Sequence, residues 1–233
     1  MRDAASIQKE KKNRLRPTVF NARYYHLKEL KRCTLMVINK YIATNPGKVL
    51  LDYGCGSMPY KPYFEPYLSK YIGADISENS AADIHLIDNK PDIPDDSVDF
   101  VLSTQVLEHV TDPELYLKES HRVLKKEGLL FLSTHGIWRY HPDPTDYWRW
   151  TGAGLKKILA DNGFEVIDVY GVMGLASMGL LLFQDAFLYK IPGFVKIIFV
   201  PFMQIQMMLF DKVHTKKNKM KDSGVFLMVA KKR

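Results

Sequence analysis

Short apolar runs alternate with amphipathic stretches along most of the chain. Seven runs are bounded by turn-forming residues and predict strands, over 48–52, 71–74, 84–87, 98–103, 129–133, 166–170 and 225–230. Apolar positions at helical spacing predict helices over 19–42, 60–69, 112–125 and 152–162. Strands that alternate with helices are typical of an α/β fold with a mostly parallel sheet, because each crossover helix covers one face of the sheet.

The last two predicted strands depart from this alternation. Residues 166–170 and 225–230 have no ordinary crossover helix between them, only a long and unusually apolar stretch. We interpret this stretch as an insertion in one large domain. The chain then divides into a basic tail with N-terminal amphipathic helices (1–45), a core (46–173), an apolar helical insertion with a lysine run (174–222), and a last core strand with a basic C-terminus (223–233).

Composition limits the class of protein. With 46% hydrophobic and 25% charged residues, the chain is neither collagen-like nor mostly disordered. It has two cysteines and no charged-then-apolar leader at its start, so we expect a cytoplasmic protein in a reducing compartment. The net charge of +7 divides into +4 over 1–16 and +7 over 212–233, which leaves the middle at −4. An acidic body with basic ends is not the profile of a nucleic-acid-binding domain, and we expect no nucleic acid partner.

The first predicted strand runs into a glycine-containing turn with the sequence DYGCGSMP (52–59). A strand that ends in Gly-x-Gly lets the backbone approach a ligand closely, and a following helix would point its free N–H groups at that ligand. Pro59 stands where a dinucleotide-binding fingerprint would have glycine. Asp52 is poorly suited to a pyrophosphate but could receive an ammonium group. The turn therefore predicts a ligand site and disfavours a dinucleotide.

Two further aspartates end the next predicted strands. Asp75 follows Asp52 by 23 positions, close to the spacing of roughly 20 residues at which an acidic side chain meets the ribose hydroxyls of a nucleoside. Asp88 ends the third strand in the same way. Because the carboxyl ends of parallel strands meet at one edge of a sheet, the three carboxylates would surround one crevice. The alternative for Asp75 is an ordinary strand-end turn.

With these residues the sequence resembles the class I methyltransferases that use S-adenosylmethionine. The resemblance rests on the stretches VLLDYGCG, YIGADIS, IPDDSVDFVLSTQVLEHV and GFEVIDVYG, and it covers about 47–172 with 225–231 as the final strand. It implies a Rossmann-like, mostly parallel seven-stranded sheet with helices on both faces and an antiparallel last strand. It also implies S-adenosyl-L-methionine as the cofactor.

The same resemblance implies roles for individual residues at the cofactor. Gly54 and Gly56 would lie under the methionine and ribose parts, and Asp75 would hold the ribose hydroxyls. The remaining residues that it implies are Ile76 against the adenine, Asp88 at the adenine amino group, and Thr104 and Gln105 at the methionine end, beside Asp52 at the ammonium. Met58 stands where the family commonly has a third glycine, and we expect it to narrow the floor of the site. The pattern predicts no metal ligands.

The loop after the fifth predicted strand carries the candidate catalytic residues. Methyl transfer to a hydroxyl requires that the acceptor be held in line and lose its proton. Residues 133–150 combine two histidines, two aspartates, two arginines and five aromatic side chains, which suits a polar ring-shaped or saccharide-like acceptor. The candidate bases are His141, Asp146 and His135. The alternative is that Asp146 pairs with Arg149 and the stretch only closes the fold.

The run HPDPTDYWRWT within this loop resembles a subset of these methyltransferases often associated with bacterial surface-polysaccharide synthesis. We therefore expect a methyltransferase that acts on a small or lipid-linked acceptor, with saccharides among the candidates. Two alternatives stay open, a nucleotide-dependent oxidoreductase and a cofactor-binding protein that has lost catalysis.

The apolar insertion has several interpretations. Polar residues and prolines interrupt its two apolar runs before either reaches the roughly 20 residues of a spanning helix. Helices lying in a membrane interface, a homo-oligomer contact, a lid over the acceptor, and a helical pair buried on its own domain all fit. A lysine run follows directly and favours peripheral contact with an anionic membrane at the inner face; it comprises Lys212, Lys216, Lys217, Lys219 and Lys221.

Overall fold

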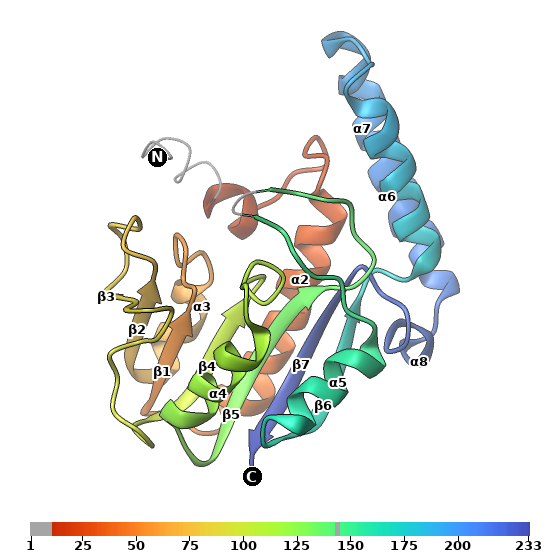
Figure 1. Ribbon diagram of the computed structural model, residues 1–233. Helices are drawn as coiled ribbons and strands as arrows, with labels where there is room; N and C mark the ends of the chain where they lie inside the picture. The colour runs from red at the N-terminus through yellow and green to blue at the C-terminus, as the bar shows by residue number, and fades with distance from the viewer. Residues whose placement is uncertain (1–10, 143–144) are drawn as a thin grey trace.

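The computed structural model describes residues 11–142 and 145–233. Its centre is a seven-stranded sheet in the order β3-β2-β1-β4-β5-β7-β6 (Figure 1). The strands are β1 (Lys48–Tyr53), β2 (Leu68–Asp75), β3 (Ile84–His85), β4 (Val98–Thr104), β5 (Leu124–His135), β6 (Phe164–Val172) and β7 (Val225–Lys232). Neighbouring strands are parallel except at β7, which runs antiparallel to both β5 and β6. The predicted fold class is confirmed.

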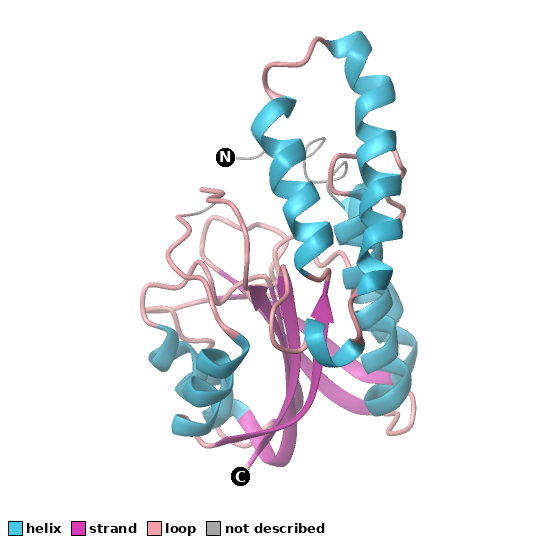
Figure 2. Cartoon of the chain, turned by 90° about the vertical axis from the view of Figure 1, so that its right-hand side faces the viewer, coloured by secondary structure: helices cyan, strands magenta, loops and turns pink. Residues whose placement is uncertain are grey.

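Helices cover both faces of the sheet, as Figure 2 shows nearly edge-on. On one face lie α2 (Tyr24–Val37), which a π-helical turn (Ile38–Ile42) extends, and the short α3 (Lys61–Phe64). On the other face lie α4 (Pro113–Val123) and α5 (Gly152–Asp161). The Asp112 carboxylate caps α4 by accepting the Leu115 N–H at 3.0 Å. Thr151 caps α5 in the same way through the Gly154 N–H.

Side-chain alternation along the strands divides the core into two clusters, one for each face. Leu50 and Phe131 belong to the cluster under α2, whereas their chain neighbours Leu51 and Leu132 belong to the cluster under α4 and α5. Nearly all of β7 is buried because it lies between β5 and β6 with a covered face on each side. This burial on both faces explains why the strands are continuous apolar runs in the sequence.

Three predicted boundaries were wrong. The helix expected over 60–69 ends at Phe64 and continues only as a 3-10 turn (Glu65–Tyr67), because Pro66 cannot supply a helical N–H, and β2 begins at Leu68. Strand β5 begins directly after α4, so Gly128 lies inside the strand instead of in a loop. Strand β3 is two residues long and ends at His85, so Asp88 does not end it.

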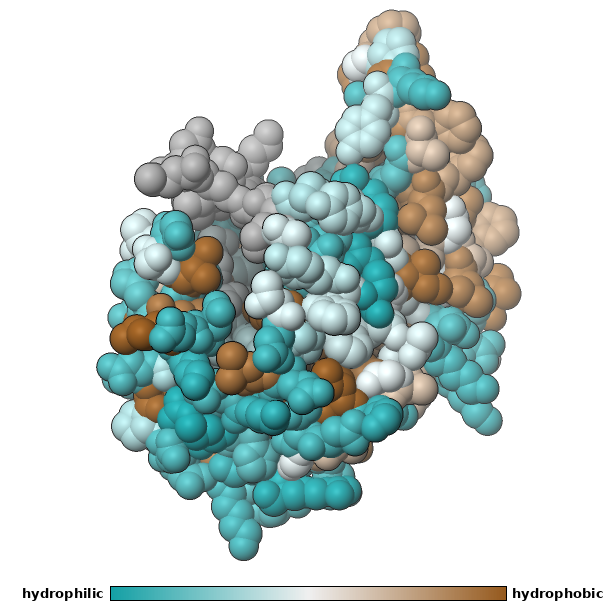
Figure 3. All heavy atoms as spheres, viewed as in Figure 1, coloured by the Kyte–Doolittle hydropathy of each residue, from teal (hydrophilic) through white to brown (hydrophobic). Residues whose placement is uncertain are grey.

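The insertion forms a helical hairpin that projects beyond the sheet (Figures 1 and 2). Its helices are α6 (Leu175–Leu188) and α7 (Gly193–Phe210), followed by a 3-10 turn (Asp211–Val213) and the short α8 (Lys216–Lys219). Within the described residues, Gly193–Val213 is the one helical stretch long and apolar enough to cross a membrane by length and composition. Apolar side chains gather along the outer side of the hairpin (Figure 3). Phe194, Ile198 and Phe202 are 76%, 76% and 56% exposed.

Buried polar contacts fix the base of the hairpin to the rest of the molecule. The Asp211 carboxylate accepts hydrogen bonds from the Tyr25 hydroxyl at 2.6 Å and from the Gly174 N–H at 2.7 Å, and it pairs with Lys219. Burial raises the pKa of Asp211, but the Lys219 ammonium and these hydrogen bonds outweigh it and hold the pKa below its ordinary value. Lys219 is therefore an internal ion-pair partner and is not available to a membrane surface, unlike the exposed lysines around it.

We expect Asp211→Ala to lower the free energy of unfolding by about 3–5 kcal/mol, because it leaves the Lys219 ammonium buried without its partner. Urea denaturation followed by circular dichroism measures this change. The control is Asp222→Ala at an exposed carboxylate nearby, which we expect to stay within about 0.5 kcal/mol of the wild type. Equal effects of the two substitutions would contradict the anchoring role of Asp211.

Candidate active site

The turn after β1 brings the backbone to the carboxyl edge of the sheet, at the top of Figure 1. Gly54 has a φ of +79°, and a Cβ at this position would lie 2.7 Å from the Val106 side chain, so the turn requires glycine. Gly56 has a φ of +51°, with nothing within 4 Å of the place where a Cβ would be. The backbone at Gly56 is thus open to a ligand.

Asp75 braces this turn from the end of β2. Its Oδ2 accepts the Gly56 N–H at 2.8 Å and the Asn79 amide at 2.7 Å, and its Oδ1 accepts the Ile76 N–H at 2.8 Å. The Ile76 side chain beside it is 46% exposed. The structure therefore brings together Gly54, Gly56, Asp75 and Ile76, all of which the sequence had indicated.

Met58 does not lie free in the turn. Its φ is +49°, a conformation that glycine adopts more easily. The side chain folds back onto β2, where its Sδ would lie 2.7 Å from a Cβ at Gly73, and it packs against the core cluster under α2. Because Gly73 has no side chain, the Met58 side chain can occupy the space above it.

Asp52 is buried at the end of β1, with 4% of its surface exposed. Its Oδ2 accepts a hydrogen bond from the Tyr71 hydroxyl of β2. Burial raises the pKa of Asp52 to about 7; the Tyr71 hydrogen bond opposes this shift and the nearby Asp75 charge adds to it. A carboxylate with such a pKa would be ionised more fully by an approaching cation.

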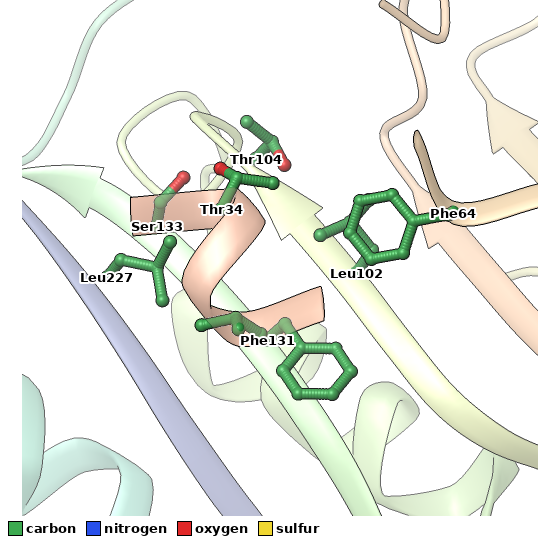
Figure 4. A pocket seen from close by; sticks show the side chains of 8 residues that line it. Thr34, Phe64, Leu102, Thr104, Phe131, Ser133 and Leu227 are labelled. Carbon is green, nitrogen blue, oxygen red and sulfur yellow. The ribbon is translucent and has the colours of Figure 1, made fainter. Parts of the chain in front are cut away.

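Thr104 and Gln105 lie where β4 ends. Gln105 has a φ of +58°, its N–H donates to the Ser133 carbonyl at 2.9 Å, and its amide nitrogen lies 3.3 Å from the Ser133 hydroxyl. Thr104 and Ser133 face a small cavity under α2 that Thr34 and Phe131 also line (Figure 4). Its accessible volume of about 10 Å³ is the room of a single water molecule. This cavity is too small for an acceptor.

The end of β5 and its following loop gather several histidines at the same edge. The His135 ring is buried and its centroid lies 4.7 Å from those of both His141 and Trp138. The His109 ring lies 4.9 Å from His141. His26 of α2 also packs against Trp138, with centroids 4.6 Å apart. Burial lowers the pKa of His26 and of His141, so both rings are neutral near pH 7.

A carboxylate faces each of the two central histidines. Glu108 Oε1 lies 2.7 Å from His135 Nδ1, and Asp146 Oδ2 lies 2.9 Å from His141 Nδ1. Burial raises the pKa of Glu108, but the His135 ring and the Thr134 hydroxyl outweigh it and leave the pKa below its ordinary value. Glu108 and His26 were missed at the sequence level. The only signal was that Glu108 precedes His109 in the LEHV stretch.

Asp146 is also held by Arg149, which donates to both carboxylate oxygens, and it accepts the His141 N–H at 3.0 Å. Burial raises the pKa of Asp146, yet these partners hold it far below its ordinary value. The Asp146–Arg149 pair that the sequence left open as an alternative is therefore present. Asp143, in the same loop, lies outside the described residues.

The structure groups most of the indicated residues but not all. The glycine turn, Asp52, Thr104 and Gln105 meet at the carboxyl ends of β1 and β4, and His135 and His141 lie at the end of β5. Asp88 lies apart from strand β3, with a φ of +50° in an exposed turn that the Ile87–Lys90 bridge closes. Its position thus depends on this turn instead of on a strand end.

Asp52 makes the stability of the protein depend on pH. Because its pKa is about 7 in the folded state and 3.8 ordinarily, the folded state binds more protons between these values, and its contribution to the free energy of unfolding falls as pH rises through this window. Asp52→Asn should remove this contribution, about 1.4 kcal/mol for each pKa unit. Urea denaturation at pH 5 and pH 7.5 measures it, with exposed Asp92→Asn as the control. Parallel pH profiles of Asp52→Asn and the wild type would exclude the raised pKa.

Comparison with known proteins places the chain in a family. The family described as a methyltransferase domain matches residues 28–169. A probable S-adenosylmethionine-dependent methyltransferase of Mycolicibacterium smegmatis is 30% identical over 151 residues, which cover 57% of this chain and 59% of that protein. A ubiquinone biosynthesis O-methyltransferase of Bartonella bacilliformis is 28% identical over 162 residues, which cover 56% and 65%. The match thus spans less than two thirds of each relative.

Solved structures share the fold. The [4+2]-cyclase SpnF has a TM-score of 0.61 at 21% identity and covers 91% of this chain and 84% of its own. An S-adenosylmethionine-dependent methyltransferase from Archaeoglobus fulgidus has a TM-score of 0.56 at 15% identity, over 97% and 99%. A cyclase on this fold shows that the fold alone does not fix the chemistry. The family match covers more than half of the sequence, and it is accompanied by relatives named as S-adenosylmethionine-dependent enzymes, so this chain belongs to the methyltransferase domain family.

Proposed function

We propose that this protein transfers a methyl group from S-adenosyl-L-methionine to a small or lipid-linked acceptor, with saccharides of bacterial surface-polysaccharide synthesis among the candidates. One observation carries the proposal. At one edge of the sheet, the glycine turn braced by Asp75 lies beside a group of histidines whose ring nitrogens face carboxylates. The glycine turn with Asp75 suits a nucleoside ligand, and the histidines beside carboxylates suit proton removal from an acceptor.

The residues at the turn fit the cofactor. The open backbone at Gly56 and the fixed Asp75 carboxylate would hold the ribose, and the exposed Ile76 would pack on the adenine. Buried Asp52 would receive the ammonium group. The remaining residues of the proposed cofactor site are Gly54, Asp88, Thr104 and Gln105. When bound, the cofactor supplies a methyl group on a positively charged sulfur.

The histidines would act on the acceptor. His135 and His141 each have one ring nitrogen beside a carboxylate, which leaves the other nitrogen for the acceptor. Asp146 is less suited to be the base than the sequence suggested, because Arg149 occupies both of its oxygens. We assign it the role of positioning His141. Trp138 and the exposed Tyr140 and Tyr147 offer aromatic faces to a sugar-like ring.

The hairpin borders this acceptor side. Arg139 of the loop lies 3.0 Å from Asp185 of α6 and 3.3 Å from the Tyr189 hydroxyl, and Arg23 also pairs with Asp185 at 2.7 Å. The hairpin itself carries many exposed apolar side chains, including Phe183, Phe187, Ile197, Ile205 and Leu209. A group of many exposed apolar side chains on a protein surface marks contact with a partner or a membrane. We propose that the hairpin holds the protein at the inner face of a membrane, next to a lipid-linked acceptor.

Asp75 tests the cofactor. We expect Asp75→Asn to weaken the binding of S-adenosylhomocysteine at least tenfold, because the amide loses charge-assisted hydrogen bonds to the ribose, each worth roughly 1.5–3 kcal/mol. Isothermal titration calorimetry measures the affinity. Glu78→Gln, at an exposed carboxylate three residues away, should bind as the wild type does. Unchanged affinity in folded Asp75→Asn would remove Asp75 from the site, and tighter binding of NAD than of S-adenosylhomocysteine would favour an oxidoreductase.

Vesicle binding tests the hairpin. We expect the protein to co-sediment with phosphatidylglycerol-containing vesicles more than with phosphatidylcholine vesicles, and less as salt is raised, because salt screens the lysines. Phe194→Ser combined with Ile198→Ser should reduce binding on both lipids, since each removes roughly 1.5–3 kcal/mol of apolar burial. Lys216→Gln with Lys217→Gln and Lys221→Gln should reduce it on the anionic vesicles.

The controls for this experiment lie away from the hairpin. Ile87→Ser removes an apolar side chain beyond β3 that is 66% exposed. Lys70→Gln with Lys126→Gln removes two exposed lysines outside the hairpin. Neither should change sedimentation. If the wild type stays in solution with anionic vesicles at low salt and its mass rises with concentration, the apolar face is a subunit contact and the membrane proposal is wrong.

A further inference from the structure

Three side chains from separate segments converge between the cofactor edge and the acceptor loop. Glu108 follows β4, His135 ends β5, and His141 lies in the loop after it. One oxygen or nitrogen atom from each lies within 4.8 Å of those of the other two. Glu108 and His135 are 0% and 3% exposed, whereas His141 is partly exposed and forms the open side of the group.

The atoms are close to each other but do not form hydrogen bonds. Glu108 Oε1 and His135 Nδ1 are 2.7 Å apart, yet both are buried and out of line for N–H···O, as is His141 Nδ1 beside Asp146. Two ligand atoms of the same metal ion are likewise close together without being aligned for a hydrogen bond, because each points at the ion and not at the other ligand. The Oε1 atom of this buried carboxylate, left without an aligned donor, would otherwise cost free energy.

We propose that Glu108, His135 and His141 bind a divalent transition-metal ion, of the class of zinc, cobalt or manganese. Two imidazole nitrogens and one carboxylate oxygen are a ligand set that such ions favour, and three protein ligands leave a position open. A second group, His109, His141 and Asp146, also converges, but Arg149 already neutralises its carboxylate.

Neighbouring residues hold these ligands in place. The Thr134 hydroxyl donates to Glu108 Oε2 at 2.8 Å, which leaves Oε1 for the ion. The Trp138 ring stacks on His135, and the Asp146 carboxylate accepts the backbone N–H of His141 at 3.0 Å. Outer partners of this kind commonly orient the ligands of a metal. No sequence motif indicated the site, because its ligands come from positions 108, 135 and 141, which only the parallel arrangement of β4 and β5 brings together.

The consequence for catalysis rests on the proposed function. A hydroxyl oxygen of the acceptor in the open position would lose its proton more easily, because a bound divalent ion lowers the pKa of an oxygen ligand. The deprotonated oxygen would then attack the methyl carbon, the bond from that carbon to the sulfonium sulfur would break, and its electron pair would neutralise the sulfur. The proton would pass to solvent. His135 and His141 would in that case be ligands instead of the base.

Metal binding can be measured without turnover. The full-length protein, stripped with a chelator and dialysed, is titrated with Zn²⁺ by calorimetry and with Co²⁺ by visible absorption. We expect one ion per chain and cobalt absorption bands typical of four- or five-coordination. Glu108→Gln keeps the size of the side chain and an oxygen for Thr134, and we expect it to weaken binding at least tenfold. His141→Ala, at the partly exposed ligand, should do the same with little risk to the core.

The matched control is His85→Ala, which removes an exposed histidine on β3. It should bind zinc as the wild type does, and thermal unfolding shows whether each variant is folded. If the wild type binds neither Zn²⁺ nor Co²⁺, or if folded Glu108→Gln and His141→Ala bind as tightly as the wild type, the proposal is wrong and the histidines serve as carboxylate-oriented bases. Binding of S-adenosylhomocysteine, measured on the same samples, reports separately on the proposed function.

Discussion

The burial of one carboxylate, that of Glu108, constrains the whole acceptor side of this molecule. A carboxylate taken out of water costs several kcal/mol unless its oxygens are occupied, and here Thr134 and His135 at the end of β5 face them. The backbone carbonyl of the same residue accepts the N–H groups of Tyr147 and Trp148. One residue thus connects the segment after β4, the end of β5 and the far end of the following loop. These three segments cannot shift separately, which gives the histidines fixed positions.

Much of the fold could be predicted from sequence because local patterns determine it. Strands β1, β4, β5 and β7 are apolar runs that are largely buried on both faces, and Asp112 and Thr151 cap helices as their chemistry predicts. The wrong boundaries arise where a local signal competes with sheet pairing. Residues 65–70 are polar enough for a helix surface, yet pairing of β2 with β1 from Leu68 onward ends the helix early. Gly128 lies between the helix predicted over 112–125 and the strand predicted over 129–133, but pairing of Leu124 with Val98 and of Leu129 with Phe100 places it within β5.

The residues of the candidate site also divide into those that the sequence indicates and those that only the packing of the chain brings together. The glycine turn and Asp75 are visible in sequence because they follow consecutive strands, whose carboxyl ends a parallel sheet brings to one edge. Glu108 and His26 are not visible in the sequence, because no spacing rule identifies a buried glutamate or a buried histidine. Only the packing of α2 and of the loop around Trp138 brings these two residues to the site. Met58 was noticeable in the sequence, but the structure places its side chain differently from what we expected. It stands where the resemblance implies a glycine and has a positive φ, and its side chain lies in the space over Gly73 instead of in the floor of the site.

The place of β7 in the sheet also has a consequence for how the chain is made. This strand is the last in the sequence, yet it lies between β5 and β6 and pairs with both. During synthesis β5 and β6 therefore leave the ribosome with unpaired edges, and residues 173–224, which hold the whole hairpin, emerge before the strand that closes the sheet. Contacts so distant in sequence form slowly. The apolar hairpin is thus able to meet another surface before the sheet is complete.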